Sequence, residues 1–150
     1  MRGYGDGTPL SMEKIEANLI DWDLKWQSGD PFSAFSMVTK SSGESWLGRK
    51  FVGTVALVKA KAFDGAELSY LLDRRYRKHG YGREAIGAVI YEYARDLLLR
   101  GYTIGSKPFT GISITPRADD KSSIRLLTSL GERCSNEVRA SALHLLLVNE

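Results

Sequence analysis

The stretch Arg77-Lys78-His79-Gly80-Tyr81-Gly82 lies between an apolar strand candidate that ends at Leu72 and a helix candidate that begins at Arg83. Two glycines one residue apart allow consecutive backbone N–H groups to point at one anion, and the helix adds the positive end of its dipole. The stretch therefore predicts a site for a compact polyanion such as a pyrophosphate; the alternative is an ordinary solvated turn. Five cations within ten residues favour the anion site: Arg74, Arg75, Arg77, Lys78 and Arg83.

Three strands are predicted before this stretch, at residues 32–39, 51–60 and 66–72. Turn residues separate them at 41–44 and at Asp64-Gly65. We expect the first two strands to pair antiparallel. Gly53 removes a side chain from the interior of the second strand, which indicates a bulge or a close approach by another backbone.

A helix is predicted at each side of these strands. The first begins with Thr8 as N-cap and Pro9 as first helical residue, and it ends at residues 29–31. The second begins at Arg83 and ends at Arg100-Gly101, a cationic last turn followed by a C-terminal glycine. Spacings of three and four predict one buried face on each helix. These faces carry Ile15, Leu19, Trp22 and Trp26 in the first helix, and Ile86, Ile90, Tyr93 and Leu97 in the second.

The last fifty residues alternate between loops and short elements. Residues 102–109 and 132–139 are predicted to be loops, and residues 110–115 a strand ended by Pro116. Asp120 or Ser122 caps a short helix that Gly131 closes. Its apolar face carries Ile124, Leu127 and Leu130. Residues 142–148 form a final strand, rich enough in leucine to be buried on both faces. The order of elements predicts a mixed α/β fold whose first half is largely antiparallel.

Length, composition and charge exclude several classes of protein. A chain of 150 residues with 43% apolar and 26% charged content is expected to be one globular domain, residues 1–150. The net charge of +3 is spread along the chain, which argues against nucleic-acid binding. Cys134 has no second cysteine for a disulfide, and no His or Cys spacing fits a metal. With no signal peptide or membrane-spanning segment in the sequence, we expect a soluble, cytoplasmic protein.

A dinucleotide-binding site is the first alternative for the glycine stretch, because residues 80–85 satisfy the pattern G-x-G-x-x-A. In that fold the strand runs directly into the first glycine, whereas seven residues separate Leu72 from Gly80. The acidic residue expected about twenty positions later is also missing. A Walker loop is excluded because no Gly-Lys-Ser or Gly-Lys-Thr occurs. A nucleotide-dependent oxidoreductase is therefore a weak hypothesis.

The sequence resembles the GNAT superfamily of acyl-CoA-dependent N-acetyltransferases. The family signature, Arg or Gln-x-x-Gly-x-Gly or Ala, is met by Arg77, Gly80 and Gly82 after a strand and before a long helix. A second family segment, Asn-x-x-Ser-x-Arg followed by an apolar helix and Leu-Gly-Phe, is similar to residues 120–131. Residues 66–70 resemble the Glu-Ile-Gly-Tyr strand of the ribosomal-protein N-terminal acetyltransferases. The likeness runs from about residue 47 to residue 131.

The resemblance implies a single domain with a mixed sheet, splayed central strands and flanking helices. It also implies transfer of an acetyl group from acetyl-CoA to a primary amine, on a small molecule or a protein N-terminus. Leu71 and Leu72 would hydrogen-bond the pantetheine arm, and one of their N–H groups would polarise the thioester carbonyl. Asp120 and Ser123 would also lie beside the cofactor. The residues implied to hold the pyrophosphate are Arg77, Lys78, His79, Gly80, Tyr81, Gly82 and Arg83.

Two catalytic residues follow from the same resemblance. Glu67 stands where several family members place a carboxylate base, acting directly or through water. Ser123 would protonate the departing thiolate or orient it, with helix capping as its alternative role. The tyrosine that serves as acid elsewhere in the superfamily falls at Leu127. Tyr70 either lines the acceptor pocket or packs in the core, and the two indoles at 22 and 26 are predicted to be core.

Two departures from the family pattern keep an alternative function open. Asp120 places a carboxylate where the family has a neutral Asn, and Glu132 replaces the usual Phe after Leu-Gly. They motivate a catalytically weak or inactive CoA-binding module with a regulatory or structural role. His144 alternates with leucines and is predicted to be a core residue. The leucine-rich final strand could complete the sheet of a second copy, which would give a homodimer.

Overall fold

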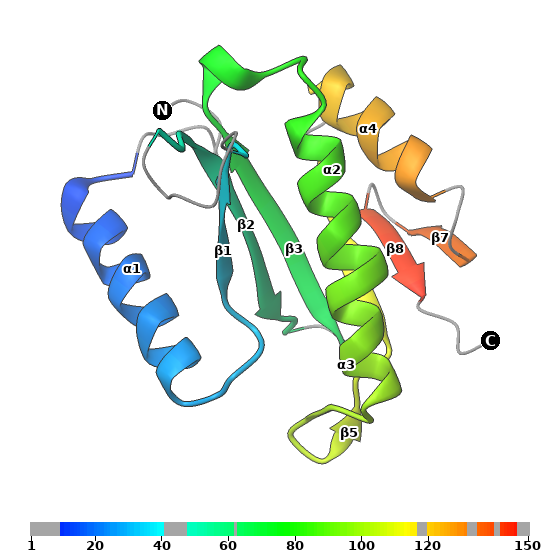
Figure 1. Ribbon diagram of the computed structural model, residues 1–150. Coiled ribbons are helices and arrows are strands. Elements are labelled where there is room, and N and C mark those ends of the chain that lie inside the picture. The colour runs from blue at the N-terminus through cyan, green and yellow to red at the C-terminus, as the bar shows by residue number, and fades with distance from the viewer. Residues whose placement is uncertain are drawn as a thin grey trace.

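The computed structural model describes residues 10–40, 48–61, 63–116, 120–131, 135–139 and 142–146, with side chains as far as Leu130. It is a mixed α/β fold in which helices flank one six-stranded sheet (Figure 1). None of the helices in these ranges is long and apolar enough to cross a membrane. The elements are α1 (Met12–Gln27), β1 (Ala34–Val38), β2 (Phe51–Lys59), β3 (Ala66–Leu72), η1 (Arg74–Tyr76), α2 (Tyr81–Ala88), η2 (Val89–Ala94), α3 (Arg95–Leu99), β4 (Thr103–Ile104), β5 (Lys107–Pro108), β6 (Gly111–Ile114), α4 (Lys121–Gly131), β7 (Ser135–Arg139) and β8 (Ala142–Leu146).

The strand order of the sheet is β1-β2-β3-β6-β8-β7. Neighbouring strands are antiparallel except β3 and β6, which are parallel. This one parallel pair is short, because it joins only Ala66 to Ile112 and Glu67 to Ser113. Beyond Glu67 the two strands separate. The predicted mixed sheet, with an antiparallel first half and splayed central strands, is confirmed.

Gly53 shows both of the features that the sequence offered as alternatives, a bulge and a close approach by another backbone. The register of β1 against β2 shifts between Met37 and Val38, opposite Gly53 and Phe51, so the pairing is bulged there. A Cβ atom on Gly53 would lie 2.1 Å from the carbonyl oxygen of Leu71 in β3. Only glycine allows these backbones to approach so closely.

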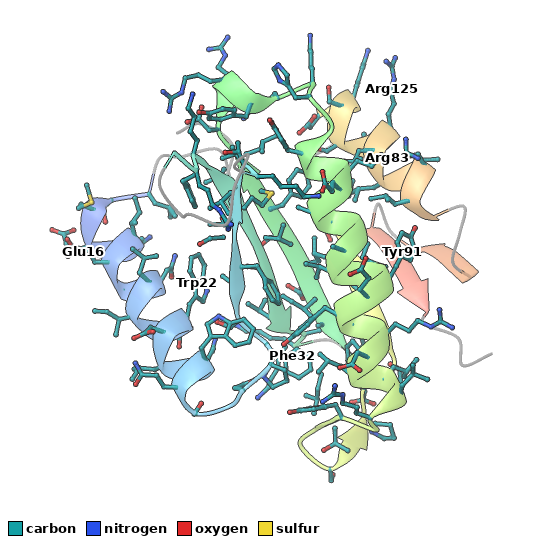
Figure 2. All side chains as sticks on the ribbon, viewed as in Figure 1. Glu16, Trp22, Phe32, Arg83, Tyr91 and Arg125 are labelled. Carbon is teal, nitrogen blue, oxygen red and sulfur yellow. The ribbon has the colours of Figure 1, made fainter. Side chains whose placement is uncertain are left out.

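The hydrophobic core lies between the sheet and the long helix that α2, η2 and α3 form together. This helix crosses the sheet in front of β3 (Figure 1), and Figure 2 shows Phe32 close to its lower half. The rings of Phe32 and Phe109 pack with their centroids 5.6 Å apart. The largest fully buried side chains include Phe32, Leu57, Ile86, Ile90, Phe109, Ile112 and Leu127.

Helix α1 differs from its prediction in its start and in its burial. It begins at Met12 with Ser11 as N-cap, so the predicted start at Thr8-Pro9 is wrong. No residue of α1 is buried, and the indole of Trp26 is 40% exposed. The physical reason is position, since α1 lies beside the edge strand β1 (Figure 1). Trp22 points toward β1 and Glu16 away from it (Figure 2), and the Trp26 indole donates a hydrogen bond to the Ala34 carbonyl at 2.9 Å.

The long helix contains a π-helical segment, η2, that periodicity did not predict. The extra residue in its turn moves Tyr93 to a half-buried position and places Ala94 in the core instead. The Tyr93 hydroxyl donates to the Pro31 carbonyl at 2.9 Å, and the Tyr91 hydroxyl donates to the Leu130 carbonyl. The two tyrosines of η2 thereby join the long helix to two different parts of the chain. The predicted end of the helix at Gly101 is confirmed by its φ of 67°.

Two predicted loops in the last third contain strands. Residues 103–108 form the small β4–β5 hairpin, and residues 135–139 form β7. A polar segment suffices for β7 because it has a single neighbour, β8, at the edge of the sheet. Strand β8 is paired on both sides, with β6 and β7, so the predicted pairing of this strand with a second copy is wrong. The predicted turn at 41–44, Cys134 and Glu132 lie outside the described residues.

Candidate active site

The point where β3 and β6 separate is the centre of the candidate site. Glu67 is the last residue of β3 that pairs with β6, and its side chain is exposed. Residues 68–72 of β3 have a ladder partner in β2 but none in β6. Backbone groups on that side of β3 therefore have no strand partner and can bind an extended molecule, although the Leu72 carbonyl accepts a hydrogen bond from Arg77 Nε. Of the two residues predicted to hold the pantetheine arm, Leu72 directs its backbone groups to this side, whereas the Leu71 carbonyl lies against Gly53 of β2.

The two predicted catalytic residues lie on opposite faces of the sheet. Side chains alternate along a strand, so Glu67 points away from the face that Tyr70 occupies. Tyr70 packs against the core beneath the helices, and its hydroxyl contacts Ser123 of α4. The structure thus brings Ser123 to Tyr70 and leaves Glu67 on the other side of the opening between β3 and β6. Such an opening can be approached from both faces.

Tyr70, Ser123 and Asp120 form a chain of hydrogen bonds across this opening. The oxygens of Tyr70 and Ser123 lie 2.5 Å apart, and Ser123 Oγ donates to Asp120 Oδ2 at 2.5 Å. Asp120 also accepts the backbone N–H of Ser123 at 3.0 Å and thereby caps α4. Of the two caps that the sequence allowed, Asp120 is confirmed. The sequence did not indicate the Tyr70 contact, because 53 residues separate the two hydroxyls.

The charges around this chain keep the carboxyl group ionised. Burial acts to raise the pKa of Asp120, but hydrogen bonds from Ser123 and the charge of Arg77 bring it below its ordinary value. Burial raises the pKa of the Tyr70 phenol, with Ser123 and Arg77 acting to lower it and Asp120 to raise it. At neutral pH the group at one end is therefore a carboxylate, and the group at the other end is a protonated phenol.

The glycine stretch lies at the N-terminus of α2, as predicted. Gly80 is the N-cap with a φ of 86°, and no side chain caps the helix. A Cβ atom on Gly80 would meet nothing within 4 Å, and one on Gly82 would only touch Leu126 Cδ2 at 3.7 Å. The fold thus leaves open backbone at a helix end where uncapped N–H groups favour an anion. Lys78 also has a positive φ of 64°, which an L-residue rarely adopts.

The five cations of this region have different surroundings. Arg75 forms an ion pair with Asp73 at 2.7 Å, and its hydrogen bonds lower the pKa of Asp73 to about 2. Arg77 donates from Nε to the Leu72 carbonyl at 3.4 Å, which places it between the end of β3 and the glycines. The positive charge of Arg75 is thus compensated within the protein. Arg74, Lys78 and Arg83 are exposed.

Ring contacts hold the loop before α2 in place. The rings of His79 and Tyr81 stack with centroids 6.1 Å apart, and those of Tyr76 and Tyr81 meet edge to face at 6.2 Å. His79 Nδ1 lies 2.7 Å from the Arg77 carbonyl. A carbonyl can only accept, so Nδ1 carries a proton. His79 could then donate from Nε2 to a phosphate only as the doubly protonated imidazolium.

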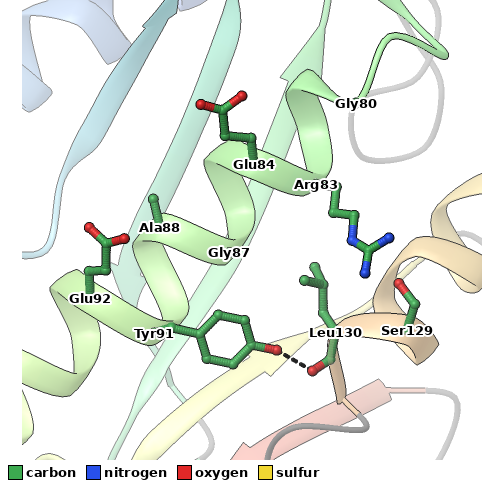
Figure 3. Close-up of a pocket in the computed structure, with 9 residues that line it drawn as sticks. All are labelled: Gly80, Arg83, Glu84, Gly87, Ala88, Tyr91, Glu92, Ser129 and Leu130. Atoms are coloured by element: carbon green, nitrogen blue, oxygen red, sulfur yellow. Dashed lines mark hydrogen bonds between the residues drawn. The ribbon is translucent and has the colours of Figure 1, made fainter.

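A groove of about 720 Å³ runs from the glycine stretch between the long helix and α4. Figure 3 shows the guanidinium of Arg83 directed toward α4 and the Tyr91 hydroxyl bonded to the Leu130 carbonyl across the groove. The sequence contained no signal for this groove, because it depends on how two helices lie against each other. Among the described residues no group of three or more His, Cys, Asp or Glu side chains could hold a metal ion.

Comparisons with solved structures agree with this geometry. The chain superposes with a TM-score of 0.61 on an acetyltransferase from Agrobacterium tumefaciens, at 16% identity over 97% of this chain and 77% of that one. A candidate ribosomal-protein-serine acetyltransferase from Vibrio cholerae gives a TM-score of 0.56 at 22% identity, over 91% and 74% of the two chains. A ribosomal-protein-alanine N-acetyltransferase from Escherichia coli gives 0.57 at 16% identity, over 99% and 83%.

These likenesses show the fold. No curated protein sequence matches the chain. The family model described as "Acetyltransferase (GNAT) domain" matches residues 1–133. This match spans most of the chain, including the glycine stretch, the separated strands and the Asp120–Ser123 turn. The chain therefore belongs to the GNAT family of N-acetyltransferases.

Proposed function

We propose that this protein transfers an acetyl group from acetyl-CoA to a primary amine. The observation that carries the proposal is the end of the β3–β6 pairing at Glu67, followed within the same strand by unpaired backbone that leads to the uncapped α2 N-terminus. Acetyl-CoA, when bound, supplies an activated acyl group as a thioester. The open Cβ position of Gly80 and the absence of a side chain at the buried Gly82 fit a diphosphate against this backbone.

The chain's own residues divide the binding task. The backbone N–H of Leu72 binds the pantetheine arm, and N–H groups of residues 80–83 bind the pyrophosphate. Arg77, Lys78 and Arg83 add charge, with His79 adding a donor when it is protonated. Arg83 also lines the groove beside α4, which offers room for the molecule beyond the pyrophosphate. Tyr81 supports the loop through its ring contacts.

Glu67 is the base of this proposal. Its carboxylate is exposed on the face opposite Tyr70, where an amine can approach the opening without meeting the cofactor-binding loop. An exposed carboxylate takes a proton from an amine through water. Ser123, on the other face, orients the departing sulfur. The base and the residue beside the leaving sulfur thus stand on different faces of the sheet.

The acceptor is a protein N-terminus or a small amine. The structural neighbours include enzymes named for ribosomal proteins and a spermidine N-acetyltransferase from Vibrio cholerae, the latter at 12% identity and a TM-score of 0.52. The resemblance of residues 66–70 to the ribosomal-protein subgroup favours a protein N-terminus. A homodimer stays a prediction.

One variant tests the binding site, and its folding can be checked separately. In Gly82→Ala the new methyl group only touches Leu126, so we expect normal folding and thermal stability. It would, however, stand between the helix N-terminus and a bound diphosphate. Isothermal titration should show affinity for acetyl-CoA lowered by about tenfold or more. Wild-type protein that shows no heat with acetyl-CoA at millimolar concentration would refute the proposal.

A catalytically weak CoA-binding module is the second candidate function, and the ionised Asp120 beside Ser123 favours it. Release of free thiol from acetyl-CoA across a panel of amines and peptides decides between the two. Steady turnover that falls in Glu67→Gln supports the enzyme. Tight binding without turnover on any acceptor supports the module.

A further inference from the structure

The hydrogen bonds of Ser123 leave it no proton to give. A hydroxyl group has one proton to donate and two lone pairs with which to accept. Asp120 is ionised and can only accept, so the proton of Ser123 Oγ points to Asp120 Oδ2. Ser123 must then accept in its contact with Tyr70, and the proton between them belongs to Tyr70 Oη. In this series of hydrogen bonds, Tyr70 therefore donates to Ser123 and Ser123 donates to Asp120.

The two hydrogen bonds in this series differ in strength. A hydrogen bond to a carboxylate is charge-assisted and roughly twice as strong as one between neutral groups. The Ser123 proton is in the strong bond, and the Tyr70 proton is in the neutral one. A phenol is also far more acidic than an aliphatic hydroxyl. Of the two, the Tyr70 proton is the one that a new acceptor can take.

The position of Tyr70 suits this transfer. It lies in β3 after the last pair with β6 and before the glycine stretch, so its hydroxyl stands beside the unpaired backbone on the helix-covered face. Leu127 of α4, whose side chain is buried and apolar, cannot donate a proton there. Tyr70 is half-buried and is fixed at its tip by Ser123.

We propose that Tyr70 Oη donates the proton that the leaving sulfur takes up, with Ser123 and Asp120 as positioning residues that hold the phenol in place. The inference rests on the proposed function. As the amine nitrogen bonds to the acetyl carbon and the carbon–sulfur bond breaks, Tyr70 gives its proton to sulfur. The proton lost by the amine passes through water to Glu67 and then to solvent. Tyr70 is reprotonated from solvent.

Among the residues that the structure describes, the charged groups that act on Tyr70 are Asp120 and Arg77. Burial and Asp120 keep the phenol protonated at neutral pH, so a proton is present at the start of each cycle. Arg77 favours the phenolate that remains after transfer. Replacing Asp120 by Asn removes one negative charge beside the sulfur and keeps an oxygen that accepts from Ser123.

Bound CoA reports on Tyr70 without turnover. A hydrogen bond from Tyr70 to the sulfur favours the thiolate, so the ultraviolet absorbance of bound CoA should give a lower thiol pKa in the wild type than in Tyr70→Phe, by about one unit. Asp120→Asn should lower it further. Desulfo-CoA has no sulfur and should bind equally well to wild type and Tyr70→Phe. Equal thiol pKa values in the two proteins would overturn the inference.

Turnover provides the second measurement. Tyr70→Phe should lower kcat for acetyl-CoA by about 100-fold with little change in KM, and Ser123→Ala by less, because the phenol keeps its proton there. A large loss in Ser123→Ala with normal rates in Tyr70→Phe would assign the proton to Ser123 and overturn the inference. Failure of CoA and desulfo-CoA to bind at all would instead refute the proposed function on which it rests.

Discussion

Glu67 and Ser113 form the last pair between β3 and β6, and the proposed binding site depends on their position. The parallel ladder ends there, five residues before the end of β3. Unpaired backbone, the glycine stretch and the base candidate are therefore found within one continuous segment. The exposed side chain of Glu67 lies on the face of β3 opposite Tyr70.

Glu67→Gln should leave the fold and acetyl-CoA affinity unchanged, because the side chain is exposed and lies away from the glycine stretch at residues 77–82. It should lower kcat at neutral pH by about 100-fold, the usual contribution of a general base. Steady-state kinetics with titration of acetyl-CoA measure both effects. Glu13→Gln, an equally exposed change on α1, is the matched control and should have normal kcat.

Arg77 and Arg75 offer a comparison within one loop. Arg77→Ala should weaken acetyl-CoA binding by about tenfold, since a charge-assisted hydrogen bond is worth about 1.5–3 kcal/mol. Arg75→Ala removes the same charge, but Asp73 already neutralises that guanidinium. The binding free energy of acetyl-CoA should therefore change by less than half as much in Arg75→Ala as in Arg77→Ala. Calorimetry at constant ionic strength distinguishes them. Equal losses would mean that only net charge holds the ligand.

Gly53→Ala should destabilise the protein by about 2–3 kcal/mol, because its methyl group would be placed against the Leu71 carbonyl oxygen, which belongs to backbone and cannot rotate away. Gly87→Ala is the control, since its new Cβ would meet only side chains at 3.8 Å and beyond. It should stabilise the helix by about 0.5–1 kcal/mol. Urea unfolding monitored by tryptophan fluorescence gives both values. A neutral Gly53→Ala would contradict the close approach of β2 and β3.

The raised pKa of Tyr93 leads us to expect a loss of stability at alkaline pH. Burial, with smaller effects of Tyr102, Asp30 and Asp96, raises its pKa to about 12 in the folded protein, above the ordinary value of 10. The neutral phenol is therefore favoured by folding, and this contribution is complete below pH 10 and is lost as the pH rises toward 12. The free energy of unfolding of the wild type should fall more steeply over this range than that of Tyr93→Phe.

At neutral pH, Tyr93→Phe should cost about 1 kcal/mol, the hydrogen bond to the Pro31 carbonyl. Urea titrations at several pH values measure both effects. Parallel curves for the two proteins above pH 10 would show that Tyr93 does not carry the alkaline transition.

Local pattern sufficed for the elements around the glycine stretch. The limits of β3 were predicted at residues 66–72, and the glycines were predicted at the start of a helix, as the structure has them. The polar strand β7 and the π-helical turn η2 were missed. An edge strand needs no apolar pattern, and a π turn changes the period on which helix prediction depends.

The sequence by itself determined the strand, the glycine turn and the helix that follow one another at residues 66–88, because apolar spacing and glycine conformation act between near neighbours in the chain. Only the tertiary structure decided that Tyr70 meets Ser123, that Glu67 faces the other way, and that the ladder ends at Ser113. Those relations join segments tens of residues apart, and they are set by the packing of α4 and β6 against the sheet. No local pattern records that packing.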